Sequence, residues 1–111
     1  MTLKELSVLH DLTQEIAMDE ERLKLLEEEN GTKAQKARVR KIIQEKRNRI
    51  WRERERLEEW IAAIPDSMKR KVFTLRFVQG LTWVQVAMAV GGGNTEDGVR
   101  KMAKRYVQSQ A

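Results

Sequence analysis

Residues 33–64 contain neither Gly nor Pro, the two residues that most readily interrupt a helix. Apolar residues recur through this stretch at helical spacing: Val39, Ile43, Ile50, Leu57 and Ile64. A helix rises about 1.5 Å per residue, so this one would be some 40–50 Å long. It can bury its apolar stripe only against a partner. This stretch therefore predicts an elongated, all-α chain.

The preceding residues supply a matching helix of opposite charge. Residues 1–31 carry net charge −6 and residues 33–64 carry +6. The first stretch has its own stripe at Leu9, Leu12, Ile16, Leu23 and Leu26. Opposite charges beside an apolar seam favour an antiparallel helical hairpin. We expect the first helix to end at Asn30-Gly31, with Gly31 left-handed, and the second to begin with a capping box of Thr32 and Gln35.

The seam of this hairpin has polar interruptions at Asp19, Lys46 and Glu53. Its C-terminal end, from Leu57 to Ile64, is strongly apolar, and we expect it to pack on the C-terminal part of the chain. The basic run 46–56 is interpreted first as a solvated helix face, because glutamates interleave with the bases. A phosphate-binding face is the alternative interpretation.

Pro65, the only proline, separates the hairpin from three shorter helices. We expect the first to be capped by Asp66 or Ser67 and to end at Gln79-Gly80. The second spans 83–90 behind a Thr82 and Gln85 capping box, and the third comes after Gly91-Gly92-Gly93-Asn94 with Thr95 as its cap. The predicted architecture is thus a hairpin or coiled-coil segment over 1–64 and a helix-turn-helix domain over 65–111.

The whole net charge of +5 lies in residues 65–111, as expected of a nucleic-acid-binding face. Projection of the last helix at 100° per residue places Asp97, Lys101, Lys104 and Gln108 opposite its apolar side, with Arg100 and Arg105 flanking them. Lys and Arg neutralise phosphates or bind guanine edges. The candidate DNA-binding residues are Asn94, Thr95, Asp97, Arg100, Lys101, Lys104 and Arg105.

Several classes of protein are disfavoured by composition. The absence of Cys excludes disulfides and thiolate metal sites, and a single His leaves few other metal ligands. We find no catalytic set, so we expect neither an enzyme nor a cofactor. No apolar run approaches the roughly 20 residues of a membrane span, and the N-terminus lacks the order of a signal peptide. We therefore expect a cytoplasmic protein that does not bind membranes.

Residues 75–87 resemble region 4, a promoter-binding part of sigma-70-type factors, in three motifs: Leu75-Arg76 at a helix end, the Gly80-Leu81-Thr82 corner and Val86-Ala87 on the next helix. Residues 91–101 are similar to small phage and prophage regulators with a sigma-region-4-like helix-turn-helix. The likeness covers about 60–109, including Ile64-Pro65-Asp66-Ser67, and is only architectural over 1–59. It implies a phage-derived transcriptional regulator in a bacterial host, bound to double-stranded DNA and able to contact RNA polymerase.

The chain departs from that pattern at three places. Gln85 replaces the usual Glu of the corner, the Gly-Gly-Gly-Asn turn is longer, and Gly98 stands where Ser or a larger residue is expected. No segment resembles the other promoter-binding region of sigma factors, so a complete sigma factor is not expected.

Two other functions stay open. A phage DNA-packaging subunit of the small-terminase kind also combines a helix-turn-helix with helical assembly surfaces. A helical adaptor would use the hairpin to bind proteins and would not bind DNA. The sequence also leaves open whether the hairpin binds polymerase, DNA or another copy in a homo-oligomer.

Overall fold

The computed structural model of the chain describes residues 1–110, and every element in that range is helical. The all-α expectation is confirmed. The elements are α1 (Leu3–Leu6), α2 (Val8–Glu28), α3 (Lys33–Ala62), α4 (Ser67–Phe73), the π-helical segment η1 (Thr74–Val78), α5 (Trp83–Val90) and α6 (Glu96–Ser109). The molecule is elongated, with extents of 53 × 25 × 17 Å.

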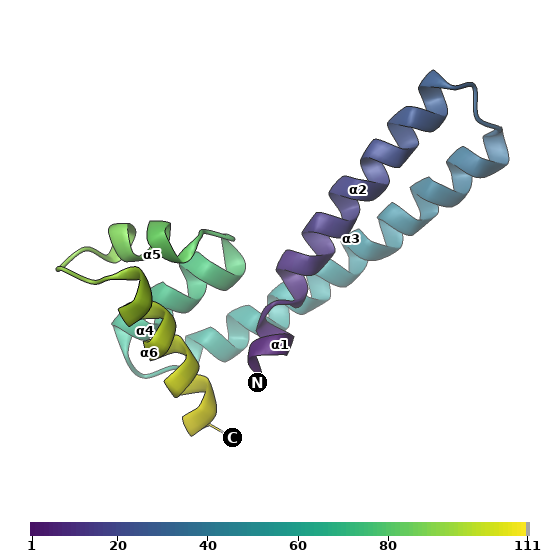
Figure 1. Cartoon of the computed structure of the whole chain (residues 1–111). Helices are drawn as coiled ribbons and strands as arrows, with labels where there is room; N and C mark the ends of the chain where they lie inside the picture. The colour runs from purple at the N-terminus through teal and green to yellow at the C-terminus, as the bar shows by residue number, and fades with distance from the viewer. Residues whose placement is uncertain (111) are drawn as a thin grey trace.

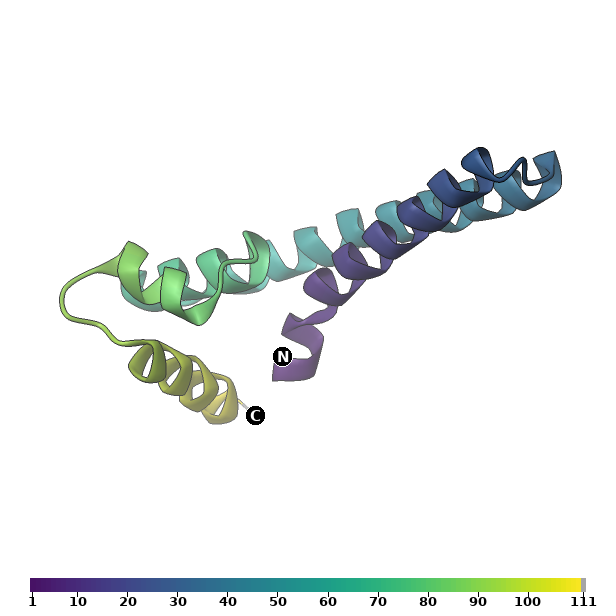
Figure 2. The ribbon, with the colours of Figure 1, turned by 45° about the horizontal axis from the view of Figure 1, so that its top comes forward.

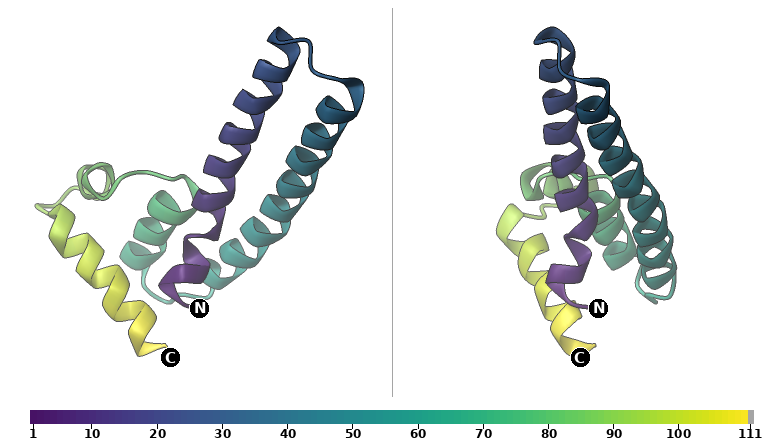
Figure 3. Two further views of the ribbon diagram at one scale, coloured as in Figure 1. Left: turned by 45° about the vertical axis from the view of Figure 1, so that its right-hand side comes forward. Right: turned by 90° about the vertical axis from the view of Figure 1, so that its right-hand side faces the viewer.

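α2 and α3 run antiparallel, side by side, along the length of the molecule (Figures 1 and 3). Acids of α2 pair with bases of α3 beside the apolar seam. Arg47 lies 2.6 Å from Glu20, and Arg40 lies 3.3 Å from Glu27. These pairs are consistent with the antiparallel arrangement that the opposite charges of the two helices favour.

Two polar residues that interrupt the seam meet one another across it. Lys46 Nζ lies 2.6 Å from Asp19 Oδ2 and 3.7 Å from Glu15 Oε1. The hydrogen bond to Asp19 and the nearby acids raise the pKa of Lys46 against the opposing effect of desolvation. The charge of Lys46 on α3 is therefore compensated by Asp19 on α2, so the two polar residues are tolerated together in the seam.

The turn between α2 and α3 differs in one detail from the expectation. Asn30, not Gly31, adopts the left-handed conformation, with φ of 54°. Asn tolerates that region because its short polar side chain can hydrogen-bond locally. Gly31 is needed for space instead, since a Cβ there would lie 2.9 Å from Leu26 Cδ2. The predicted capping box is confirmed: Gln35 N–H donates to Thr32 Oγ1, and Thr32 N–H donates to Gln35 Oε1.

The main core lies where the base of the α2–α3 pair meets α4, η1, α5 and α6, so it draws on both sides of Pro65. Its buried members are Leu6, Leu9, Leu57, Ile61, Ile64, Val72, Phe73, Phe77, Val86, Ala87, Val99, Ala103 and Val107. Phe73 is fully buried and meets Trp60 edge-on at 5.1 Å between ring centroids. The expected packing of the apolar end of α3 on the C-terminal helices is thus confirmed.

A second, smaller core holds the outer part of the α2–α3 pair together. It consists of Ile16, Val39 and Ile43, with Leu23 and Leu26 partly buried against it. Two helices alone enclose little volume, which explains why so few residues are buried here. The end of the pair near Asn30–Thr32 projects away from the rest of the molecule (Figure 2).

The helix after Pro65 begins as expected and ends differently. Asp66, rather than Ser67, is the cap, accepting a 2.9 Å hydrogen bond from the Lys69 N–H. The last five residues of the expected helix form the π-helical segment, and Gln79 N–H donates to the Thr74 carbonyl five residues back. Gly80 then ends the helix at φ of 76°. Short π-helical segments are rare and often occur near functional sites.

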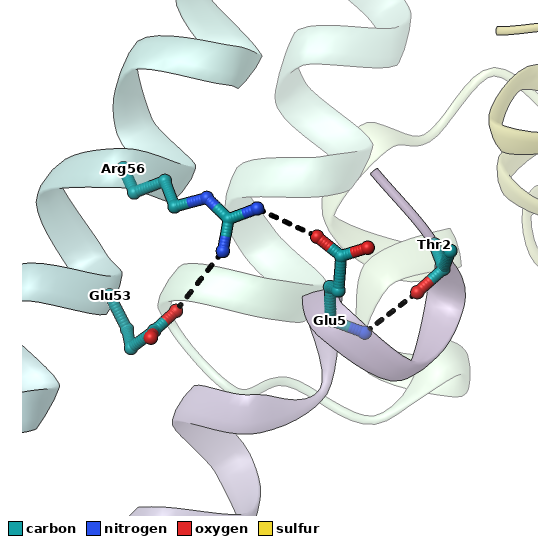
Figure 4. A network of polar contacts seen from close by, with 4 residues as sticks. All are labelled: Thr2, Glu5, Glu53 and Arg56. Atoms are coloured by element: carbon teal, nitrogen blue, oxygen red, sulfur yellow. Dashed lines mark hydrogen bonds and ion pairs between the residues drawn. The ribbon is translucent and has the colours of Figure 1, made fainter. Parts of the chain in front are cut away.

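The short helix α1 is fastened to α3 by a polar network and an apolar anchor (Figure 4). Arg56 lies 2.8 Å from Glu5 and 3.9 Å from Glu53, while Thr2 caps α1 by accepting from the Glu5 N–H. Desolvation opposes the ionisation of Glu5, but Thr2, the chain's amino terminus and Arg56 together lower its pKa. Leu6 is buried in the main core.

Candidate nucleic-acid interface

α5 and α6 pack against each other. The Gly91–Asn94 turn connects them (Figure 2). Both helices are capped as predicted. Thr82 and Gln85 form the capping box of α5, and Thr95 Oγ1 accepts a 3.0 Å hydrogen bond from Gly98 N–H. Val86 and Ala87 of α5 are buried in the same core as Val99 and Ala103 of α6. The packing fixes which face of α6 points outward.

The outer face of α6 is polar and basic. Asp97, Lys101, Lys104 and Gln108 are all exposed, as the projection predicts, and so are Arg100 and Arg105 beside them. Its inner face comprises the predicted Val99, Met102, Ala103 and Tyr106, and Val107 as well, which the projection missed.

Two of the candidate residues are already engaged in local structure. Asn94 Nδ2 donates a 2.7 Å hydrogen bond to the Gly91 carbonyl, which closes the turn. The Thr95 hydroxyl serves as the helix cap. Both stand at the start of α6, where free backbone N–H groups favour an anion.

Asp97 binds two of the neighbouring cations. Its carboxylate lies 2.8 Å from Lys101 Nζ and 2.7 Å from Arg100 Nη2. The hydrogen bond from Lys101, followed by that from Arg100, lowers the pKa of Asp97. Because all three side chains are exposed, these pairs are weak and can be exchanged for contacts with another anion.

Lys104 and Arg105 make no ion pair with any residue in the described range 1–110. They lie in the second half of α6, one turn or more beyond Asp97. Gly98 lies in the first turn, where a Cβ would stand 3.0 Å from Thr95 Oγ1. The glycine therefore leaves room for the cap.

A groove of about 490 Å³ adjoins the basic face of α6. Three of the α6 cations line it, and they share it with α1 and with residues at the junction of η1 and α5: Leu3, Ser7, Arg76, Phe77, Trp83, Arg100, Lys101 and Lys104. The groove thus has an apolar floor and a positively charged rim.

Arg76 is absent from the predicted site, although it stands in the Leu75-Arg76-Phe77 motif. Its Nη1 donates a 2.9 Å hydrogen bond to the Leu81 carbonyl, and its guanidinium lies 4.9 Å from the centre of the Trp83 ring. These contacts fix a cation beside those of α6. The sequence alone does not indicate this role, because it depends on how Arg76 packs against Leu81 and Trp83 beyond the turn.

No family model, curated protein or solved structure matches the chain. Within residues 1–110, no three potential metal-ligating side chains gather at one place. None of the helices described is long and apolar enough to cross a membrane.

Proposed function

We propose that this protein is a sequence-specific DNA-binding transcriptional regulator. In this proposal the α2–α3 pair is a hairpin, α4–α6 form a sigma-region-4-like helix-turn-helix domain, and α6 enters the major groove. The observation that carries the proposal is the outer face of α6, where four bases are exposed on a helix held from behind by α5. The Gly91–Asn94 turn and the two confirmed caps support the same interpretation.

The roles of the site residues are inferred from their geometry. Lys104 and Arg105, free of internal ion pairs within residues 1–110, bind DNA directly. Arg100 and Lys101 exchange Asp97 for phosphates or for base edges such as guanine O6 and N7. Asn94 and Thr95 set the start of α6 so that its N–H groups face a phosphate.

The sequence resemblance supplies the biological setting of the proposal. It points to a phage-derived regulator that acts in the cytoplasm of a bacterial host and contacts RNA polymerase. One structural observation favours a protein contact in addition to DNA. Val84 and Met88 of α5 lie one turn apart and are 49% and 78% exposed. Exposed apolar side chains on so short a helix suit a protein partner.

The test is selection of bound sequences from a random duplex library at two salt concentrations, followed by affinity measurements. We expect an enriched motif. With that duplex, Lys101→Ala combined with Lys104→Ala should weaken binding and reduce the slope of log affinity against log salt by up to about 2. The matched control is Lys33→Ala with Lys36→Ala, which removes the same charge at the far end of α3 and should leave the slope close to wild type.

The alternatives give different results. Salt-dependent binding without a motif, together with a ring of several copies in solution, would favour a DNA-packaging subunit. Absence of binding at both salt concentrations would rule out the regulator and favour a protein adaptor.

A further inference from the structure

Two groups of bases on α3 differ in whether α2 neutralises them. Arg40, Lys46 and Arg47 lie on the flanks of the seam and pair with acids of α2. A second group points away from the seam: Arg38, Lys41, Arg49 and Arg52. All four are exposed, and none forms an ion pair within residues 1–110. We call these four residues the α3 basic stripe.

The stripe is a compact feature of the helix surface. At 100° per residue, its members fall within a sector of about 80°, and the centre of that sector lies about 120° from Val39 in the apolar seam. They extend over about 21 Å, since 14 rises of about 1.5 Å separate Arg38 from Arg52. That distance exceeds the roughly 12 Å width of a DNA major groove. Between Arg38 and Arg52 one acid, Glu45, lies within the sector, and it forms no ion pair with any stripe residue.

The stripe leads toward the groove beside α6. Its next member by helical spacing is Arg56, which Glu5 and Glu53 neutralise (Figure 4). Glu5 belongs to α1, and Leu3 of the same short helix lines the groove that holds the α6 cations. The short helix α1 therefore contacts both the basic groove and Arg56, which lies about one turn beyond the near end of the stripe.

The chemistry of the stripe fits phosphates better than a protein. No large apolar side chain lies in its sector, whereas protein interfaces have an apolar core. Trp51, the exposed aromatic residue of α3, lies on another side of the helix. Regularly spaced, unpaired Arg and Lys are the groups that follow a nucleic-acid backbone.

We propose that the α3 basic stripe binds the phosphate backbone of the same DNA duplex that α6 contacts, on the flank of the α6 site. This inference rests on the proposed DNA-binding function. The molecule is 53 Å long, which matches about 16 base pairs at roughly 3.4 Å each. The α2–α3 pair thus lengthens the footprint on DNA without reading bases.

The experiment compares the DNA affinity of two double variants at several salt concentrations. The DNA is a duplex of about 30 base pairs with the selected motif at its centre. Arg49→Gln with Arg52→Gln removes two stripe charges and should reduce the salt slope by about 2. Arg40→Gln with Arg47→Gln removes equal charge from the flank of the same helix and should change the slope little. Melting curves show whether both variants keep their helices, as expected because exposed ion pairs contribute little.

A gain-of-binding variant makes the test independent of misfolding. Glu45→Gln removes the one acid of the sector between Arg38 and Arg52 and should tighten binding and steepen the salt slope. Glu58→Gln, on the opposite flank of α3, should do neither. On a duplex cut to about 10 base pairs around the α6 site, the effects of Arg49, Arg52 and Glu45 should vanish.

Three results would overturn the inference. If the stripe variant and the flank variant behave alike while Lys101→Ala with Lys104→Ala still weakens binding, α6 binds DNA and the stripe does not. If the wild-type chain forms dimers at low salt that the stripe variant loses, the stripe binds the acidic α2 of a second copy. If no variant alters binding, or nothing binds, the proposed function fails together with the stripe.

Discussion

Asp97 pairs with two of the four cations on the outer face of α6, and these pairs would act on the proposed DNA binding in two opposite ways. A carboxylate among the bases repels phosphates and occupies Arg100 and Lys101. The same carboxylate also restrains the side chains of Arg100 and Lys101. Its negative charge in the first turn of α6 interacts favourably with the positive end of the helix dipole. The weakness of exposed ion pairs decides between these effects, since neither cation is bound to Asp97 strongly enough to be withheld from a phosphate.

We therefore expect Asp97→Asn to increase DNA affinity and to steepen the salt slope by about 1, because one negative charge leaves the interface. The matched control is Glu96→Gln, which removes a neighbouring first-turn acid without an ion pair in the described chain. Binding isotherms at two salt concentrations measure both variants. Weaker binding by Asp97→Asn alone would show that Asp97 positions Arg100 and Lys101 for base contacts.

At the level of the helices, the Lys46–Asp19 pair illustrates how a polar seam position is tolerated. The two side chains are 25% and 18% exposed, so neither is fully hydrated. The pKa of Lys46 is raised, so the stabilisation from its charge is fully present below the ordinary lysine pKa. It is lost only as the pH rises through the raised value in the folded protein. The pair therefore stays formed at neutral pH.

Asp19→Leu or Lys46→Leu alone should lower the free energy of unfolding modestly, because each leaves the other charge partly buried without its 2.6 Å partner. The double variant should be at least as stable as wild type, since an apolar pair replaces the ion pair at the seam. Urea unfolding of all four proteins measures the coupling. Additive losses in the double variant would mean that the two residues stabilise the seam independently.

The elements that could be predicted from sequence are those with local causes. Thr32 with Gln35, and Thr82 with Gln85, bond over three residues, so their patterns specify both helix starts. No local sequence pattern predicts the π-helical turn before Gly80. The same limit applies to Arg76, whose contacts lie beyond the turn, and to the pairing of Lys46 with Asp19, which requires the register of two helices.

Over the whole molecule, the main core joins the base of the α2–α3 pair to the three C-terminal helices. Leu57, Ile61 and Ile64 precede Pro65 in sequence but are buried with residues that come after it. A cut at Pro65 would separate these side chains from Val72, Phe73 and their neighbours. Loss of one buried Leu or Ile typically costs about 2–5 kcal/mol, and a domain has only about 5–15 kcal/mol in total.

We accordingly expect residues 65–110 alone to be largely unfolded and not to bind the selected duplex. Circular dichroism measures the helix content directly. A control chain with a short Gly-containing turn in place of residues 25–40 loses the tip but keeps the main core, and it should stay helical. A folded 65–110 fragment would show that the C-terminal helices form a core without α3.

The shared core also bears on how such a chain can evolve. Recombination at Pro65 would place the core residues before it and those after it in different proteins. Neither product would then contain the full set of side chains that pack together in the main core. The C-terminal helices are therefore not a cassette that can be moved alone onto another protein. A transfer that keeps them folded has to include the end of the long helix before them, because Leu57, Ile61 and Ile64 belong to the same core.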